Sequence, residues 1–172
     1  MRRLIGALTL DPMVFEDVEA DWDATLQAGF TVVLSSISAA VGAQGFGRDL
    51  SGMLPFTVLM LIAWAAWALL TFEVGTRLLP GARTHADVGE LLRTIGFAAT
   101  PGLLLALGAL PGAAAPIFVV ATLWMLAAMI VAVRQALDYT STLRAVAVCV
   151  FGWLLAVALV FGVGFWAATP LA

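Results

Sequence analysis

The chain has 172 residues, of which 63% are hydrophobic and 11% charged, and its mean hydropathy is +1.06. An average soluble domain has about 25% charged residues, and a domain of about 150 residues buries only about 70% of its surface, so a soluble fold could not bury this much apolar side chain. These values exclude a soluble enzyme and a nucleic-acid-binding domain, and they indicate an integral membrane protein.

The first ten residues combine Arg2 and Arg3 with a short apolar run that ends at Asp11-Pro12. The run has the minimum length of a signal-peptide core and lacks a small-residue cleavage pattern, so we expect it to be retained. An Asp followed by Pro is a favourable helix start, because Asp caps the first backbone N–H groups and Pro fits the first turn. A helix is therefore predicted to begin at Asp11-Pro12.

Residues 11–23 contain six acidic residues and an apolar stripe in which Val14, Val18 and Trp22 recur every four positions. This spacing predicts a short amphipathic helix at the inner membrane interface. Anionic lipid headgroups repel acidic side chains, so the acidic side is either solvated or contacts Arg residues of this chain or of a partner. The candidate partner-binding residues are Val14, Asp17, Val18, Glu19, Asp21 and Trp22.

Uncharged stretches divide the rest of the chain into membrane spans. Stretches of 24, 23 and 28 residues each accommodate one span of about 20 residues. The 40 uncharged residues after Arg93 accommodate two, because Leu110-Pro111-Gly112 and Pro116 interrupt them. We predict an all-α polytopic membrane protein with an N-terminal interfacial segment at 1–24 and a transmembrane domain at 25–172. Its five helices are expected at about 25–45, 53–72, 95–110, 116–134 and 146–168.

The distribution of Arg residues predicts the orientation. Seven of the eight Arg residues lie in the N-terminal segment, the 73–93 loop and the 134–144 loop, and Arg48 alone lies on the other side. Arg-rich short loops stay in the cytoplasm, so the N-terminus is predicted inside and the C-terminus outside. The expected anchors at the inner face are Arg77, Arg83, Arg93, Arg134, Asp138 and Arg144.

The 73–93 loop contains two local helix signals. Glu73 and Arg77 have the i,i+4 spacing of a helical ion pair. The segment from Thr84 to Asp87 resembles a capping box, which predicts a helical turn that leads through Glu90 and Arg93 into the third span.

The first predicted span has a face of small and hydroxyl-bearing residues, formed by Thr31, Ser35, Ser38 and Gly42. Such faces favour close helix packing in lipid, although the same residues could line a hydrophilic path. Both interpretations stay open from the sequence alone.

Residues for catalysis or cofactor binding are scarce. His85 is the single histidine and lies outside every predicted span, and Cys149 is the single cysteine. Haem and zinc sites need more His, Cys or carboxylate ligands than the predicted spans offer, and no phosphate loop or hydrolase motif occurs. We therefore predict no metal, no cofactor and no enzymatic activity.

A family resemblance follows from two segments. Residues 91–102, in which Gly96-Phe97 precedes Pro101, resemble the start of the third helix in Yip-domain proteins of the Ypt/Rab-interacting type. Residues 132–145 are similar to that family's link between helices four and five. The resemblance implies a non-catalytic polytopic membrane protein, and eukaryotic relatives are tied to Rab GTPases and vesicle traffic.

The chain also departs from the eukaryotic pattern. It lacks the long cytosolic arm with Asp-Leu-Tyr-Gly-Pro, and Asp49-Leu50-Ser51-Gly52 falls in a predicted outer loop, so GTPase binding is not carried over. The short, Lys-free chain looks like the bacterial branch.

We predict a multi-pass protein of the bacterial inner membrane that acts as a scaffold or accessory subunit of a larger assembly. Its expected partners are membrane lipids and other membrane subunits or copies of itself, with no nucleic acid. The alternative is a small oligomeric transporter or channel lined by the Ser/Thr face of the first span.

Overall fold

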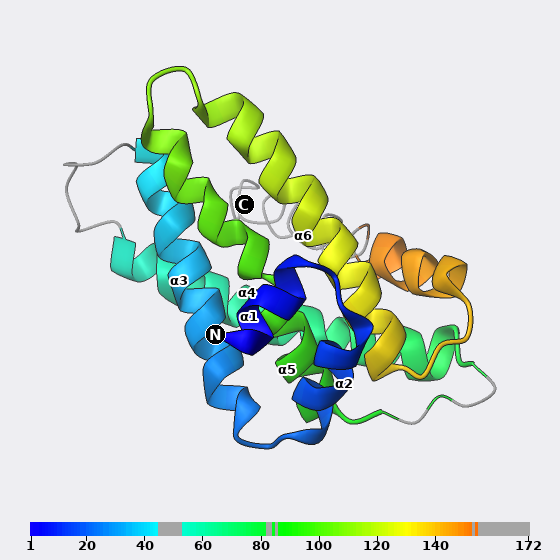
Figure 1. The fold of residues 1–172 in the computed structure, drawn as a ribbon. Coiled ribbons are helices and arrows are strands. Elements are labelled where there is room, and N and C mark those ends of the chain that lie inside the picture. The colour runs from blue at the N-terminus through cyan, green and yellow to red at the C-terminus, as the bar shows by residue number, and fades with distance from the viewer. Residues whose placement is uncertain (45–52, 82–83, 85, 153, 155–172) are drawn as a thin grey trace, which may run out of the picture.

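The computed structural model describes residues 1–44, 53–81, 84, 86–152 and 154, and its regular elements within these ranges are all helical. Two short helices, α1 (Arg2–Leu8) and α2 (Pro12–Ala20), precede the long helices. The long helices are α3 (Ala24–Gln44), α4 (Met53–Glu73) with the π-helix η2 (Val74–Leu78), α5 (Val88–Ala98) with the 3₁₀ helix η3 (Thr100–Ala109), and α6 (Ala114–Ala136), and a short helix follows at Thr142–Gly152 (Figure 1).

Four of the described helical segments are long and apolar enough to cross a membrane. They cover Ala24–Gly42, Thr57–Leu78, Val88–Ala109 and Ala114–Ala136. The helical membrane fold is thus confirmed. The fifth predicted span, 146–168, begins within the shorter apolar helix Thr142–Gly152, and most of its remainder lies outside the described residues.

The third span begins seven residues before its predicted start. The Asp87 side chain accepts a hydrogen bond from the Glu90 backbone N–H, at 2.9 Å, and the Glu90 carboxylate accepts one from the Asp87 backbone N–H, at 2.7 Å. The capping box is therefore formed by Asp87 and Glu90 and not, as predicted, by Thr84 and Asp87. The Thr84 hydroxyl instead accepts a hydrogen bond from the Gly81 backbone N–H. The helix then continues through Glu90 and Arg93 into the third span, as predicted, so the capped turn and the span form one helical segment.

Pro101 marks the change from α5 to η3 within this span. Proline has no N–H, so the Phe97 carbonyl loses its usual helical donor. The Thr100 hydroxyl donates to that carbonyl at 2.5 Å, and the Ser35 hydroxyl of α3 donates to the Ala99 carbonyl at 2.7 Å. Hydroxyl groups of the chain thus stabilise its irregular backbone.

α3 packs closely on α5 and η3 along a line of small residues, which we call the seam. Gly96 lies against Ala28, Gly102 against Ser35, and Gly42 against the Leu105 carbonyl. A β-carbon added to Gly96 would lie only 2.6 Å from the Ala28 β-carbon. Small side chains therefore set the distance between these two spans, as is common for helices in lipid.

The charged segments of the chain gather at one end of the helix bundle. Residues 1–23, which contain α1 and α2, are called the N-terminal hairpin. The hairpin lies beside α5 and α6 at this end (Figure 1). The Tyr139 hydroxyl donates to the carbonyls of Gly75 and Leu79, and Arg144 donates to the Pro80 carbonyl at 2.8 Å. The hairpin, the 73–93 segment and the 134–144 segment are thus neighbours in space.

Candidate functional site

The N-terminal hairpin is attached to the bundle by the apolar side of α2. Asp11 caps this helix as predicted, because its carboxylate accepts from the Met13 N–H at 3.0 Å. Val14, Phe15 and Val18 are buried in a cluster that includes Phe97 of α5 and residues of α6. Val14 and Val18, two of the candidate partner-binding residues, therefore contact the chain's own helices.

Trp22, the third residue of the predicted apolar stripe, is 77% exposed. It follows the end of α2 at Ala20 and so leaves the helical spacing that relates Val14 to Val18. The Arg93 guanidinium carbon lies 5.3 Å from the centre of its ring, within the range of a cation–π interaction. Trp22 is thus held on one face and open to solvent or a partner elsewhere.

Arg3 of α1 binds the acidic side of α2. Its Nε lies 2.9 Å from the Asp17 carboxylate and its Nη2 lies 2.7 Å from the Asp21 carboxylate. Hydrogen bonding to Arg3 lowers the pKa of Asp21, and the same bond raises the pKa of Arg3. From the sequence we considered Arg residues of the later loops for this contact and missed Arg3, which the turn between α1 and α2 brings onto these acids.

Arg93 has a different role from the expected headgroup anchor. Arg93 belongs to α5, the α-helical part of the third span, and is 2% exposed. Its Nε and Nη2 donate to the Glu19 backbone carbonyl at 3.0 and 2.5 Å, and its guanidinium passes close to Gly89. Because α5 begins at Val88, Arg93 lies in its second turn and faces α2 rather than the membrane surface.

The Glu19 carboxyl lies in a group of acidic side chains. The pKa of Glu19 is raised to about 7, chiefly by burial and also by the nearby charges of Glu90, Asp138 and Glu16, while Arg93 partly offsets these effects. Glu16 accepts a hydrogen bond from the Gln135 side chain of α6 at 3.0 Å. The docked hairpin therefore has one carboxyl whose protonation changes near neutral pH.

The remaining predicted anchors have exposed or local contacts. Arg77 forms the predicted ion pair with Glu73, at 2.9 Å, and both side chains are exposed. Arg134 donates to the Tyr139 carbonyl at 3.2 Å, and Arg144 lies 5.9 Å from the Tyr139 ring. Asp138 is exposed and has a φ of 50°, beyond the end of α6.

Two residues singled out in the sequence, the expected anchor Arg83 and the single histidine His85, lie outside the described residues. Within the ranges that the structure describes, no group of three or more His, Cys, Asp and Glu side chains is arranged to hold a metal ion.

The polar face of α3 is directed to backbone carbonyls. Thr31 donates to the Gln27 carbonyl at 2.8 Å, Ser36 to the Val32 carbonyl at 2.7 Å, and Ser35 to the Ala99 carbonyl next to α5. Ser38 is partly exposed, and Gly42 contacts the η3 backbone. The hydroxyls of Thr31, Ser35 and Ser36 therefore contribute to helix structure and packing.

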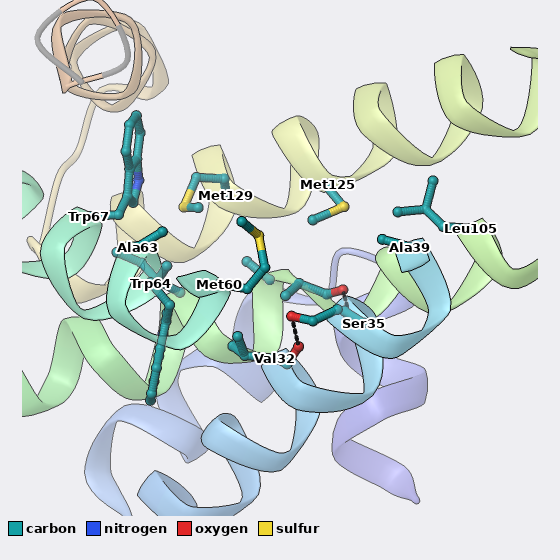
Figure 2. Close-up of a pocket in the computed structure, with 14 residues that line it drawn as sticks. Val32, Ser35, Ala39, Met60, Ala63, Trp64, Trp67, Leu105, Met125 and Met129 are labelled. Carbon is teal, nitrogen blue, oxygen red and sulfur yellow. Dashed lines mark hydrogen bonds between the residues drawn. The ribbon is translucent and has the colours of Figure 1, made fainter. Parts of the chain in front are cut away.

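An apolar cavity of about 360 Å³ lies between the four long helical segments (Figure 2). α4 contributes Met60, Trp64 and Trp67, and α6 contributes Met125 and Met129. The Trp64 indole N–H donates to the Leu92 carbonyl at 3.2 Å, whereas the Trp67 indole N–H has no partner among the described residues. No ionisable side chain from the described part of the chain lines the cavity. Its lining is mainly apolar, with Ser35 and Ser36 among the polar residues.

Comparison with known proteins identifies one family. The family model of the Yip1 domain matches residues 6–164, which is nearly the whole chain. No curated protein and no solved structure gives a significant match. The resemblance of residues 91–102 and 132–145 to Yip-domain proteins is thereby confirmed, and the bacterial branch stays a prediction.

Proposed function

Because the chain belongs to the Yip1 domain family, we propose that it acts as a non-catalytic scaffold or accessory subunit that docks a basic segment of a partner on its N-terminal hairpin. The docking surface consists of Glu16, Asp17, Trp22 and Asp23, all exposed. The observation that supports it is the exposed Trp22 ring, which Arg93 holds in place beside exposed carboxylates.

The chemistry of this surface favours a basic protein segment over the lipid headgroups. Anionic headgroups repel the carboxylates, whereas Lys and Arg side chains of a partner would complement them. Exposed ion pairs contribute about 0–1 kcal/mol each, so the charges mainly set orientation and association rate. A held aromatic side chain such as Trp22 is the type of residue that contributes most to affinity at interfaces.

The proposal includes a location in the bacterial inner membrane, with the hairpin end of the bundle in the cytoplasm. The Arg bias supports this orientation. Seven of the eight Arg residues belong to the hairpin, the 73–93 segment and the 134–144 segment, and hydrogen bonds join these three segments to one another at that end. Reporters fused in the 73–93 loop should then be active only in the cytoplasm. If a reporter that is active only in the periplasm were active when fused in that loop, this orientation would be wrong.

The transporter alternative receives less support. A path for ions or polar solutes needs polar or ionisable side chains that face it. The hydroxyls of Thr31, Ser35 and Ser36 donate to backbone carbonyls, and none of the described residues that line the cavity beside them is ionisable. The scaffold role therefore agrees better with the described residues.

Copurification of the full chain from mild detergent tests the scaffold role. Trp22→Ala should reduce the recovery of a stable partner at least tenfold, whereas Leu26→Ala, which removes another exposed apolar side chain, should leave it unchanged. Trp22→Phe keeps an aromatic face for Arg93 and should retain most of the partner. The double variant Glu16→Gln with Asp23→Asn should weaken recovery mainly at low salt.

The same experiment can contradict the proposal. If Trp22→Ala retains every copurifying protein at the wild-type level, the hairpin is not the docking surface. Limited proteolysis of residues 1–23 in each variant separates loss of binding from release of the hairpin, because only a released hairpin is cleaved faster.

A further inference from the structure

A second crevice lies between α1 and α3. It has a volume of about 550 Å³ and reaches Phe97 of α5 at its base. Its polar end is formed by Arg2, Arg3 and Gln27. Its apolar wall includes Phe30 and Leu34 of α3. The crevice is thus amphipathic and has charged lining residues, unlike the mainly apolar cavity between the four long helical segments.

Arg2 supplies the unbalanced positive charge of this crevice. Two of the described residues that line it are Arg, but the charge of Arg3 is balanced by the Asp17 and Asp21 carboxylates of α2. Arg3 is oriented by Asp17 and Asp21 and by a hydrogen bond from its Nη1 to the Gln27 side-chain oxygen at 3.4 Å. Arg2 is exposed, and no carboxylate of the described residues lies within ion-pair distance of it.

The polar and apolar parts follow one another along a spanning helix. Gln27 is in the first turn of α3, and Leu34 lies seven residues further, which corresponds to about 10 Å along the helix axis. Phe30 is 67% exposed and Leu34 is 50% exposed, so both present apolar surface to the bilayer. A phospholipid has the same order of a charged headgroup followed by a hydrocarbon chain.

We propose that this crevice binds one anionic phospholipid, with the lipid phosphate at Arg2 and an acyl chain along Phe30 and Leu34, while Arg3 stays paired with Asp17 and Asp21. The planar guanidinium group matches the geometry of phosphate oxygens, and no carboxylate in the described ranges competes for Arg2. The lipid would fill the space between α1 and α3.

Native mass spectrometry of the full chain in detergent, with added phosphatidylglycerol, tests this site. Arg2→Gln should weaken retention of the lipid about fivefold, which is the effect expected for one basic residue at an anionic membrane surface. Arg2→Lys should keep most of the retention. Arg77→Gln is the matched control, because it removes another exposed Arg at the same end of the bundle and should have no effect.

The apolar part of the site needs its own comparison. Phe30→Ala should also lower phosphatidylglycerol retention, whereas Ile62→Ala, at a similarly exposed position of α4, should not. The wild-type chain should retain phosphatidylglycerol better than phosphatidylcholine, and Arg2→Gln should reduce this preference. Inorganic phosphate at millimolar concentration should not displace the lipid, because it lacks the acyl chain.

Three results would overturn the proposal. Equal losses in Arg2→Gln and Arg77→Gln would mean a general effect of net charge. Unchanged retention in Arg2→Gln would mean that the crevice does not bind the headgroup. Displacement by inorganic phosphate alone would mean a site for free phosphate. These results concern lipid retention only, so they do not depend on whether the hairpin docks a protein partner.

Discussion

The seam between α3 and the α5–η3 span and the docking of α2 on α5 use the same helix in different ways. At the seam, Gly96 and Gly102 let backbones approach closely, and the polar contact described across it is the Ser35 hydroxyl bonded to the Ala99 carbonyl. At the hairpin, the buried Arg93 side chain reaches a backbone carbonyl and an exposed Trp22 ring. One contact depends on shape, and the other depends also on charge.

This difference shows how one part of a largely apolar protein can be released while the rest stays folded. The seam contacts at Gly96, Gly102 and Ser35 involve no ionisable group, so they should not depend on pH or salt. The hairpin contact combines burial of the apolar side of α2 with a buried cation, so it responds to changes in charge. Four predictions test this division, from the largest expected effect to the smallest.

Gly96→Val should break the seam. Its β-carbon alone would lie 2.6 Å from the β-carbon of Ala28 and 3.1 Å from the α3 backbone, so the two spans must separate. We expect the free energy of unfolding in detergent to fall by about 3 kcal/mol, the upper range for overpacking. Gly29→Ala is the control, because its β-carbon would lie 3.9 Å from Trp64, and it should be neutral or stabilising. Equal effects of the two variants would contradict the steric account.

Arg93→Leu should release the hairpin while the spans remain folded. The change removes two charge-assisted hydrogen bonds to the Glu19 carbonyl and the contact with Trp22. We expect docking of the hairpin to weaken by about 2 kcal/mol, since hydrogen bonds to charged groups contribute about 1.5–3 kcal/mol. Hydrogen exchange should rise in residues 12–23 and stay low in α3. Exchange that rises equally in both regions would mean that Arg93 stabilises the whole bundle.

Ser35→Ala should weaken the seam slightly. It removes the hydroxyl that donates to the Ala99 carbonyl, next to the irregular backbone at Pro101. Interhelical hydrogen bonds in membranes contribute about 0.6 kcal/mol on average, so the thermal midpoint should fall by only a few degrees. Ser36→Ala, whose hydroxyl bonds within α3, serves as the comparison and should have a smaller effect. A loss as large as that of Gly96→Val would mean that Ser35 has a further role.

Docking of the hairpin should weaken as pH rises through 7. Burial and neighbouring carboxylates raise the pKa of Glu19 from an ordinary 4.5 to about 7, so between these values the docked hairpin keeps a proton that the released hairpin loses. Docking is therefore favoured near pH 5 and disfavoured near pH 8. The effect should be the smallest of the four, because Glu19 is partly exposed and solvent screens the interactions of its carboxyl.

Proteolysis of residues 1–23 at pH 5 and pH 8 measures this dependence. Glu19→Gln should flatten it, whereas Glu73→Gln, at an exposed ion pair, should leave it unchanged. A hairpin that is protected equally at both pH values in the wild-type chain would mean that Glu19 does not control docking.

Local sequence signals were sufficient for several parts of this protein. Apolar length predicted the first, second and fourth spans within a few residues, and Asp11-Pro12 predicted the start of α2. The Glu73–Arg77 ion pair followed from helical spacing alone. These features depend on neighbours within four or five positions, or on total hydrophobicity, and both can be counted along the chain.

The sequence predicted a helical turn through Glu90 and Arg93 before the third span, but it did not predict the contacts of the Arg93 side chain. An Arg at the end of an apolar stretch can lie at the membrane surface or be buried, and the sequence does not distinguish the two. For Arg93, the packing of α2 against α5 decides that it is buried. The pair Asp87 and Glu90 was the available signal, since a capping box there places Arg93 inside the helix.

By itself, the sequence determined that this chain is a helical membrane protein of the Yip1 family with an acidic, capped helix near its start. The tertiary structure decided which side of that helix is available. Val14 and Val18 are buried on the bundle, whereas Trp22 and the carboxylates of Glu16 and Asp23 are exposed. The physical reason is that an apolar stripe predicts that a helix face is buried but does not predict what covers it. Here α5 and α6 of the same chain cover this face.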